Sequence, residues 1–205
     1  HMEALFFEAQ DQLDAGNTSA AARLFAKATA VTASSLPARI VTSNACNSLA
    51  ELKIDEAVAS GFPMLVQDYN LASEARQLLQ RALNLWPQNA QAAMSLALLE
   101  RDCGHAELAL ELWTMVAALP DEAADSDEWA EAWIFEPRRR CVPLAAMHSA
   151  LLLCQLGRAA QAAPTLRRFG FTRALAPGVW ACARAPPAGG GTAASSNGGS
   201  CGGRS

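Results

Sequence analysis

Two histidines and six cysteines are the side chains of this sequence best suited to catalysis or metal binding, because imidazoles move protons and thiolates attack substrates or bind metals. His105 directly follows Gly104, and His148 lies in an apolar stretch. The cysteines are far apart, without a C-x-x-C pair or a histidine at metal-ligand spacing: Cys46, Cys103, Cys141, Cys154, Cys182 and Cys201. We expect His105 to be an ordinary exposed turn residue, His148 to be a core or groove-lining residue, and the cysteines to behave as small buried hydrophobes.

The remaining motifs do not indicate an enzyme. The glycine cluster Gly189–Gly191 follows no predicted strand and opens no predicted helix, so it does not have the context of a phosphate-binding loop. Cys201 is the one cysteine expected in an exposed stretch, where it is oxidisable without an evident role. No nucleophile–base pair, acid–base pair or metal-ligand set is recognisable. The sequence therefore predicts a protein without a catalytic, cofactor or metal site.

An acidic segment, DEWAEAWIFEPRRR, carries the most unusual side chains of the chain. Trp129 and Trp133 are four residues apart, so a helix places both rings on one face. Two interpretations follow: a partner-binding amphipathic segment, or two tryptophans that cap the hydrophobic core, which we favour. The three arginines Arg138–Arg140 suit a phosphate or an acidic peptide. We favour a solvated patch that neutralises the preceding acids.

The composition predicts an all-α protein. Alanine and leucine, which form helices readily, are the commonest residues, while valine and isoleucine, on which sheets depend, together number only ten. A net charge of −4 in 205 residues excludes the strongly basic surface of a nucleic-acid binder. The longest apolar run, Cys141–Leu156, falls short of the ~18 residues that span a bilayer. With no signal peptide recognisable and with reduced cysteines, we expect a soluble, cytoplasmic chain.

Glycine and proline divide the chain into helical blocks, because glycine ends helices and proline is tolerated in their first turn. Breaks are expected at Gly16, Gly104, Pro137 and Gly157, among others. The expected helices are Glu3–Ala15, Thr18–Thr32, Pro37–Glu51, Ile54–Ser60, Pro63–Asp68, Leu71–Leu85, Ala90–Asp102, Ala106–Leu119, Trp129–Phe135, Pro143–Leu156 and Ala159–Phe169.

Alanines recur at fixed distances around four turn markers, Gly16, Leu52, Gly104 and Gly157. Each marker has an alanine seven residues before it and another five residues after it: Ala9, Ala45, Ala97 and Ala150, then Ala21, Ala57, Ala109 and Ala162. Two antiparallel helices approach closely only where the facing residues are small. The spacing therefore predicts closely packed helical hairpins.

The stretch Asn89–Pro120 resembles a tetratricopeptide repeat. The packing positions of that motif are occupied by Leu96, Ala97, Gly104, Ala109, Trp113 and Val116. Asn70 and Gly104 are 34 residues apart, which is the period of this family. The resemblance covers Glu3 to Phe169, and it departs from the pattern at Leu52, where a glycine is expected, and at Gly61, where a large residue is expected. It implies antiparallel helix pairs stacked as a short right-handed solenoid.

On this basis we divide the chain into four parts: helical repeats at 1–120, an acidic insert with a short helix at 121–142, a final helical hairpin at 143–170, and a tail at 171–205. The insert is expected on one face of the array, as insertions in helical repeats are. Beyond Pro177 the sequence is rich in glycine, serine, alanine and proline, so it buries too little apolar surface to offset its conformational entropy. We expect the tail to be mostly disordered.

The resemblance implies a non-catalytic module that binds a helix or an extended peptide of another protein in a concave groove. The inner helix faces carry Thr42 and Cys46 together with the residues that we predict to contact the partner: Phe6, Gln10, Met94, Leu98, Met147 and Leu151. These side chains provide no cationic clamp of the kind with which related co-chaperones hold a carboxylate. We expect neither nucleic acid nor membrane as a partner.

Two other hypotheses come from different functional classes. The chain suits an N-terminal helical accessory region of a larger enzyme whose catalytic domain is absent, because the composition changes abruptly after Trp180. It also suits a structural oligomer that pairs its end helices. A catalytic sequence after Trp180 would support the former, and a mass that depends on concentration would support the latter.

Overall fold

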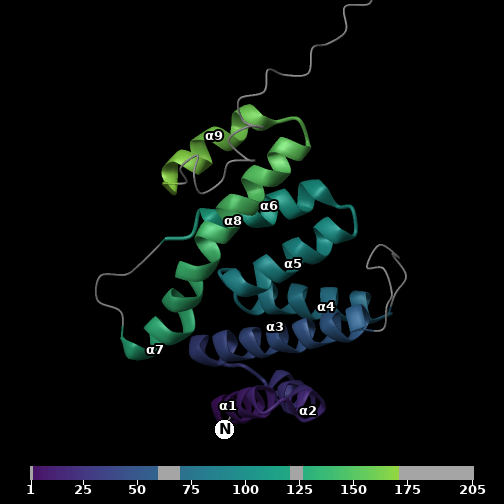
Figure 1. Cartoon of the computed structure of the whole chain (residues 1–205). Helices are drawn as coiled ribbons and strands as arrows, with labels where there is room; N and C mark the ends of the chain where they lie inside the picture. Colours follow the sequence, from purple (N-terminus) through teal and green to yellow (C-terminus); the bar gives the residue numbers. More distant parts are fainter. Residues whose placement is uncertain (1, 60–69, 121–126, 171–205) are drawn as a thin grey trace, which may run out of the picture.

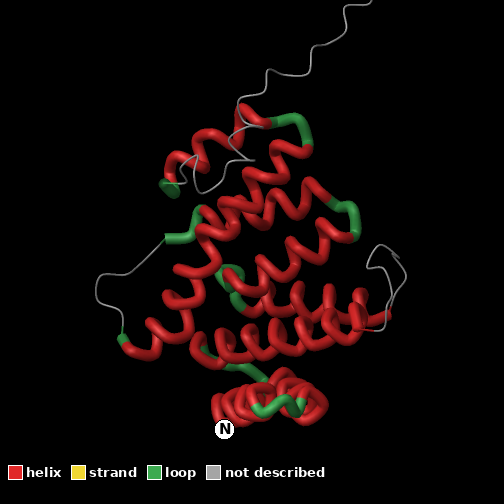
Figure 2. The backbone as a smooth tube through the Cα atoms, viewed as in Figure 1, coloured by secondary structure: helices red, strands yellow, loops and turns green. Residues whose placement is uncertain are grey.

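The computed structural model describes residues 2–59, 70–120 and 127–170, and these are helical apart from short turns (Figure 2). The helices are α1 (Met2–Asp14), α2 (Thr18–Ala30), α3 (Leu36–Ala59), α4 (Asn70–Leu85), α5 (Ala90–Asp102), α6 (Ala106–Ala117), α7 (Glu128–Ala130), the π-helical turn η1 (Glu131–Phe135), α8 (Glu136–Gln155) and α9 (Ala159–Arg168). No strand occurs in these ranges, so the predicted all-α class is confirmed for them. The expected helix Pro63–Asp68 and the tail at 171–205 lie outside the described residues.

Three of the four turn markers are helix ends in the structure. Gly16, Gly104 and Gly157 have φ angles of +79°, +85° and +72°, a left-handed conformation that residues with a Cβ adopt only with strain. They join α1 to α2, α5 to α6 and α8 to α9 through short turns, as Figure 1 shows. The sequence prediction of a helical hairpin at each of these three glycines is confirmed.

The alanines at marker spacing are core residues, which confirms their predicted role in close helix contacts. Each is at most 2% exposed: Ala9, Ala21, Ala45, Ala57, Ala97, Ala109, Ala150 and Ala162. Large side chains fill the space beside them, among them Phe25, Trp113 and Leu166, which are at most 1% exposed. The core therefore alternates small and large residues, a pattern that lets neighbouring helices interdigitate.

The prediction of a turn at the fourth marker, Leu52, was wrong. Leu52 lies inside α3, which continues without interruption from Leu36 to Ala59. The physical reason is local, because the residues around Leu52 include neither glycine nor proline and most of them tolerate a helix well. The predicted pair of helices Pro37–Glu51 and Ile54–Ser60 is a single helix of 24 residues.

The expected break at Pro137 was also wrong. The chain from Glu128 onward is continuously helical through η1 into α8, with Pro137 in the first turn of α8 and Pro143 inside it. The wider π turn immediately before Pro137 changes the hydrogen-bond register where the proline lacks an N–H donor. Buried side chains on both sides of Pro143, Arg138 and Val142 before it and Ala146 after it, hold this helix against its neighbours.

The helices stack in chain order, with α1 and α2 at one end and α9 at the other (Figure 1). The long segment α7–η1–α8 departs from a simple stack, because its first part reaches back to the N-terminal helices. There Trp133 joins a cluster with Ile40 and Val41 of α3 and Trp86, which follows α4. Within the described ranges, no helix is both long enough and apolar enough to span a membrane.

A buried amide connects three of these helices. Asn89, which is 1% exposed, caps the N-terminus of α5 by accepting from the Ala92 backbone N–H at 3.0 Å. Its amide nitrogen donates to Ser43 Oγ and Asn44 Oδ1 of α3, at 2.8 and 2.9 Å. Ser43 Oγ in turn donates to the Ala82 carbonyl of α4 at 2.8 Å. These hydrogen bonds give the buried groups their partners, and they fix the distances between α3, α4 and α5.

We predict that Asn89→Ala lowers the free energy of unfolding by about 2–3 kcal/mol, since it removes a helix cap and leaves two buried polar side chains without their donor. Urea unfolding followed by circular dichroism measures the change. The matched control is Asn84→Ala at an exposed position near the end of α4, for which we expect a change below about 0.5 kcal/mol. Equal effects of the two substitutions would contradict the role assigned to Asn89.

Candidate functional site

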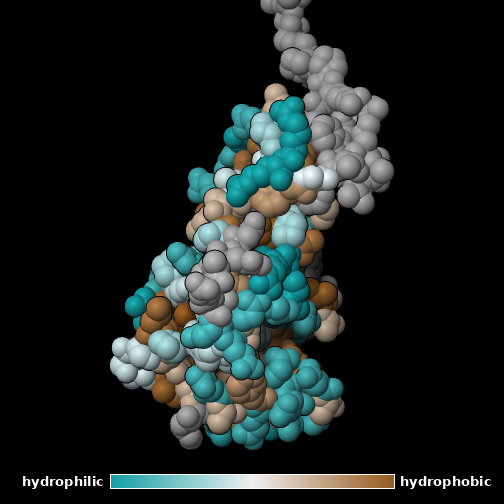
Figure 3. All heavy atoms as spheres, turned by 90° about the vertical axis from the view of Figure 1, so that its left-hand side faces the viewer, coloured by the Kyte–Doolittle hydropathy of each residue, from teal (hydrophilic) through white to brown (hydrophobic). Residues whose placement is uncertain are grey.

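Figure 3 views the molecule from the side on which α7 and the start of α8 lie. Hydrophilic side chains cover most of this side, and hydrophobic ones form small separate groups rather than one broad patch. A broad exposed apolar patch is the usual mark of a flat interface. On this side, therefore, a hollow in the surface is the better candidate for a binding site.

A groove of about 390 Å³ opens between α1, α3 and the segment formed by η1 and the start of α8. Its volume lies within the range of pockets that bind small molecules or a few side chains. The lining residues are Phe6, Phe7, Gln10, Leu13, Asn44, Asn47, Ser48, Glu51, Leu52, Asp55, Gln91, Ala132, Trp133, Glu136, Pro137 and Arg140. Aromatic, amide and charged side chains thus meet in one hollow.

Aromatic rings form one wall of the groove. The Trp133 ring lies 4.9 Å from that of Phe6 and 5.5 Å from that of Phe7, measured between centroids. Trp129 stacks on Trp133 at 6.1 Å, so the two tryptophans share a face as the sequence predicted. Trp133 is only 9% exposed and packs into the cluster with α3, which agrees with the core-capping interpretation. Phe7 remains 53% exposed at the mouth of the groove.

Amide side chains line the groove on α3, and their hydrogen bonds show which end of each amide is the oxygen and which is the nitrogen. Asn89 must direct its oxygen to the Ala92 N–H, so its nitrogen faces Asn44 Oδ1, and the Asn44 nitrogen is left without a partner among the described residues. Asn47 donates to Glu51 Oε1 at 3.0 Å. Because a carboxylate only accepts, the nitrogen of the Asn47 amide faces Glu51 and its Oδ1 faces away from it. This oxygen is buried and has no hydrogen-bond donor in the described structure.

The charge of the groove is negative. Three carboxylates line it, those of Glu51, Asp55 and Glu136, against the single guanidinium of Arg140. That guanidinium is already paired with Glu136 at 2.7 Å. Glu51 and Asp55 form no ion pair with any described residue. The site therefore attracts positively charged groups.

The structure brings together only two of the six predicted partner-contact residues. Phe6 and Gln10 line the groove. Met94 is a core residue, 8% exposed, and Leu98 packs against the same core. On α8, Met147 is half-buried and Leu151 is 37% exposed, and neither lines the groove; Thr42 and Cys46, also placed on the inner faces, are buried.

The groove residues that sequence reasoning missed have a recognisable signal. Asn44, Asn47, Ser48 and Glu51 recur at spacings of three and four, which places them on one face of a helix. We predicted a turn at Leu52, so we did not recognise that the polar face continues along one helix to Asp55.

The three arginines of the acidic segment differ from one another. Arg139 pairs with Glu131 at 2.5 Å and Arg140 with Glu136, so the predicted solvated patch is confirmed for these two. For Arg138 the prediction was wrong, because it is 4% exposed. Its guanidinium donates to Gln88 Oε1 at 2.7 Å and lies over two aromatic rings, and burial lowers its pKa.

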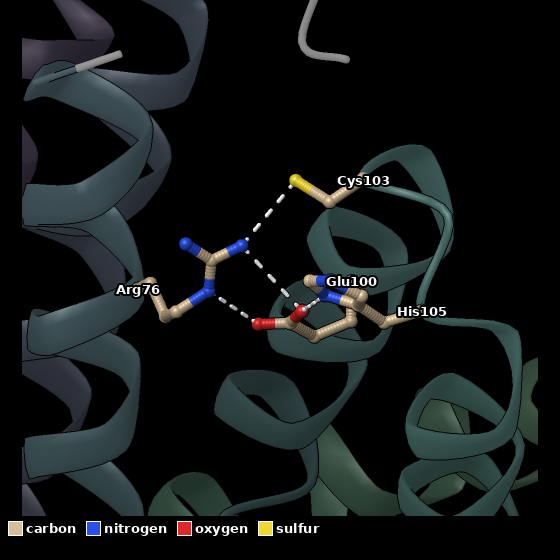
Figure 4. Close-up of polar contacts among 4 residues, drawn as sticks. All are labelled: Arg76, Glu100, Cys103 and His105. Carbon is tan, nitrogen blue, oxygen red and sulfur yellow. Dashed lines mark hydrogen bonds and ion pairs between the residues drawn. The ribbon is translucent and has the colours of Figure 1, made fainter. Parts of the chain in front are cut away.

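A second cluster of reactive side chains lies at the turn between α5 and α6 (Figure 4). Glu100, 2% exposed, accepts from Arg76 Nε and contacts His105 Nδ1, both at 2.5 Å. Burial alone would raise the pKa of Glu100, but hydrogen bonds from Arg76 and His105 outweigh it and lower the pKa below its usual value. Cys103 Sγ is 3.3 Å from Arg76 Nη2 and points toward that guanidinium rather than toward the imidazole (Figure 4).

This arrangement is not that of a nucleophile with its base, which would require the thiol to face the imidazole. It is a link between helices, since Arg76 belongs to α4 and the other three residues to α5 and the turn after it. His105 remains 45% exposed, as expected for a turn residue, but it is held by Glu100.

The other candidate side chains are packed into the structure. Cys46 and Cys103 are buried, and Cys141 and Cys154 are half-buried. Burial raises the pKa of Cys46 and of Cys141 to about 11, which makes these thiols poor nucleophiles. Cys182 and Cys201 lie outside the described residues. The described ranges hold no group of three or more side chains placed to bind a metal ion.

His148 is half-buried and packs beside the core, which agrees with the first of the two positions predicted for it, a core or a groove-lining one. Its ring stacks on Trp113 with centroids 5.0 Å apart and planes inclined by 19°. Burial lowers its pKa from the ordinary value of 6.5, and the nearby Arg101 charge lowers it further. The neutral imidazole is therefore the form that suits this contact.

No protein-family model matches the sequence, and a search of curated proteins found no similar one.

We predict that the free energy of unfolding falls as the pH is lowered from about 7.5 to about 5.5. His148 takes up a proton more readily in the unfolded chain than in the folded one, so stability present at neutral pH is lost below the unfolded pKa of 6.5. Denaturation at a series of pH values measures this. His148→Gln should flatten the profile, and a slope unchanged by this substitution would refute the assignment.

Proposed function

We propose that this chain is a non-catalytic protein-interaction module that holds a segment of a partner protein in the groove between α1, α3 and α8. The observation that carries the proposal is the meeting of an aromatic wall with polar side chains of α3, among them the unpaired amide nitrogen of Asn44, in one accessible hollow. Such a site provides apolar contact for anchoring side chains and polar partners that fix their orientation.

The amide groups suit a peptide better than a purely apolar ligand. Asn44 offers an N–H donor, and Ser48, one turn further along the same helix, offers a hydroxyl that both donates and accepts. A peptide backbone carries donors and acceptors in every residue, so an extended segment can satisfy both side chains. Gln10 and Gln91 add further groups of the same kind on α1 and α5.

The finer arrangement that we propose is a tetratricopeptide-like array, with antiparallel helix pairs stacked as a right-handed solenoid. The glycine turns at Gly16, Gly104 and Gly157 and the buried alanines at matched positions support it. We propose that it works in a reducing, cytosol-like compartment, which the free thiols of Cys46 and Cys141 favour.

Photo-crosslinking from inside the groove tests the proposal. Benzoylphenylalanine in place of Phe7, an exposed ring at the groove mouth, should yield a covalent product with the partner in cell extract. The same substitution of Leu108, an exposed residue on α6 outside the groove, should not yield that product. A product that forms equally from both positions would contradict a groove-specific partner.

We further predict that Ser48→Trp, which fills the groove from α3, abolishes the product formed from position Phe7. The matched control is Thr114→Trp, which adds the same ring at an exposed position of α6 and should leave the product unchanged. Thermal unfolding by circular dichroism shows whether each variant is folded. If a folded Ser48→Trp variant still forms the product, the partner does not occupy this groove.

A further inference from the structure

The groove contains a row of oxygen acceptors along one face of α3. Asn47, Glu51 and Asp55 follow one another at intervals of four residues, and all three line the groove. Asn47, which is 3% exposed, donates its amide N–H to Glu51 Oε1 at 3.0 Å. This hydrogen bond holds the Glu51 carboxylate in place on the groove face of α3.

The two carboxylates of this row lack a cation. Glu51 accepts from Asn47 and from Ser95 Oγ, which are neutral donors. Asp55 lies one turn further along α3. Like charges four residues apart on a helix repel each other, so a cation bound between them would stabilise the fold as well as the complex.

An exposed aromatic surface lies in the same groove. Phe7 is 53% exposed, and its ring meets that of Trp133 at 5.5 Å with planes inclined by 67°. The faces of aromatic rings attract cations, and a planar guanidinium can lie flat on them. A ligand that reaches both walls must therefore combine positive charge, several N–H donors and a flat shape.

The protein already binds one guanidinium of its own in a similar environment. Arg138 lies over the rings of Trp86 and Phe135, with its carbon 5.9 and 5.5 Å from their centroids, and donates to the amide oxygen of Gln88. Rings and an amide oxygen thus suffice to hold a buried guanidinium in this fold. The groove offers the same two kinds of group and adds two carboxylates.

We propose that the partner segment is anchored in this groove by an arginine side chain. Its guanidinium donates to the carboxylates of Glu51 and Asp55, and its flat face lies against the aromatic wall. Arginine suits the row better than lysine, because it carries five N–H donors in a rigid fork while an ammonium carries three on a single atom. This inference rests on the proposed function and specifies the chemistry of the partner.

Selection of random peptides displayed on phage against the full chain tests it. Peptides that bind the wild type but not Ser48→Trp should share an arginine. Synthetic copies of the strongest binder, with arginine, lysine or citrulline at that position, are then compared by calorimetry. Citrulline keeps the shape and loses the charge, so we expect it to weaken binding by about tenfold or more, and lysine to weaken it less.

The variant Glu51→Gln/Asp55→Asn should lose the preference for arginine over citrulline, while the glutamine still accepts from Asn47. The matched control Glu8→Gln/Asp11→Asn removes the same two charges from exposed positions of α1 outside the groove, and it should keep the preference. Melting curves establish that both variants are folded.

The outcomes separate the two proposals. Groove-dependent peptides without an arginine, or with lysine in its place at equal affinity, would overturn the arginine anchor and leave the interaction module standing. A preference for arginine that survives Glu51→Gln/Asp55→Asn would overturn the assigned contacts. If no selected peptide depends on the groove, both proposals fail.

Discussion

The fold depends on the buried side-chain amide of Asn89. It caps the N-terminus of α5 and donates hydrogen bonds that hold α3 beside that helix. Its oxygen is committed to the Ala92 N–H, so its nitrogen can only donate toward α3. The register of α3 against α5 is thereby specified, because a slide of one turn would separate the Asn89 nitrogen from both of its acceptors and leave Asn44 Oδ1 without a donor. Packing of alanines alone would not specify it, since small residues recur along these helices and permit several registers.

The candidate site follows from that register. Asn44 takes part in the Asn89 network and lines the groove, so the same contact that aligns the helices also turns the polar face of α3 toward α1. Asn47, Glu51 and Asp55 extend this face along the helix. On the other side, the segment from α7 to α8 folds back and places Trp133 against Phe6 and α3. The groove is the space that remains between a fixed polar face and this aromatic cover.

Features determined by a few neighbouring residues could be predicted from the sequence. The helix ends at Gly16, Gly104 and Gly157 are of this kind, because a left-handed backbone conformation is a property of glycine itself. The stacked pair Trp129 and Trp133 and the ion pair of Arg140 with Glu136 are of the same kind, since a spacing of four residues along one helix brings these groups together.

Features that depend on tertiary packing were missed. Nothing near Arg138 in the sequence shows that Trp86, Gln88 and Phe135 enclose it, because two of these belong to the distant turn between α4 and α5. Leu52 was assigned to a turn from its distance to other markers, although its own neighbours favour a helix. The groove was missed for the same reason, since it lies between helices whose contact is set by a side-chain network rather than by periodicity.

Arg138 also bears on why a site for a second arginine would need carboxylates. The guanidinium of Arg138 is covalently part of the fold, so rings and one amide oxygen are enough to retain it, and burial still lowers its pKa. A partner's arginine gives up translational and rotational freedom as well as hydration, so the same two groups would bind it weakly. Glu51 and Asp55 add opposite charge where the ligand's desolvation must be offset.

Glu100 shows the converse case, a buried carboxylate kept charged by Arg76 and His105. In this protein, buried charges occur where a cation contacts oxygen atoms and aromatic or imidazole rings. The groove provides the oxygen atoms and the rings, and a partner's arginine would provide the cation.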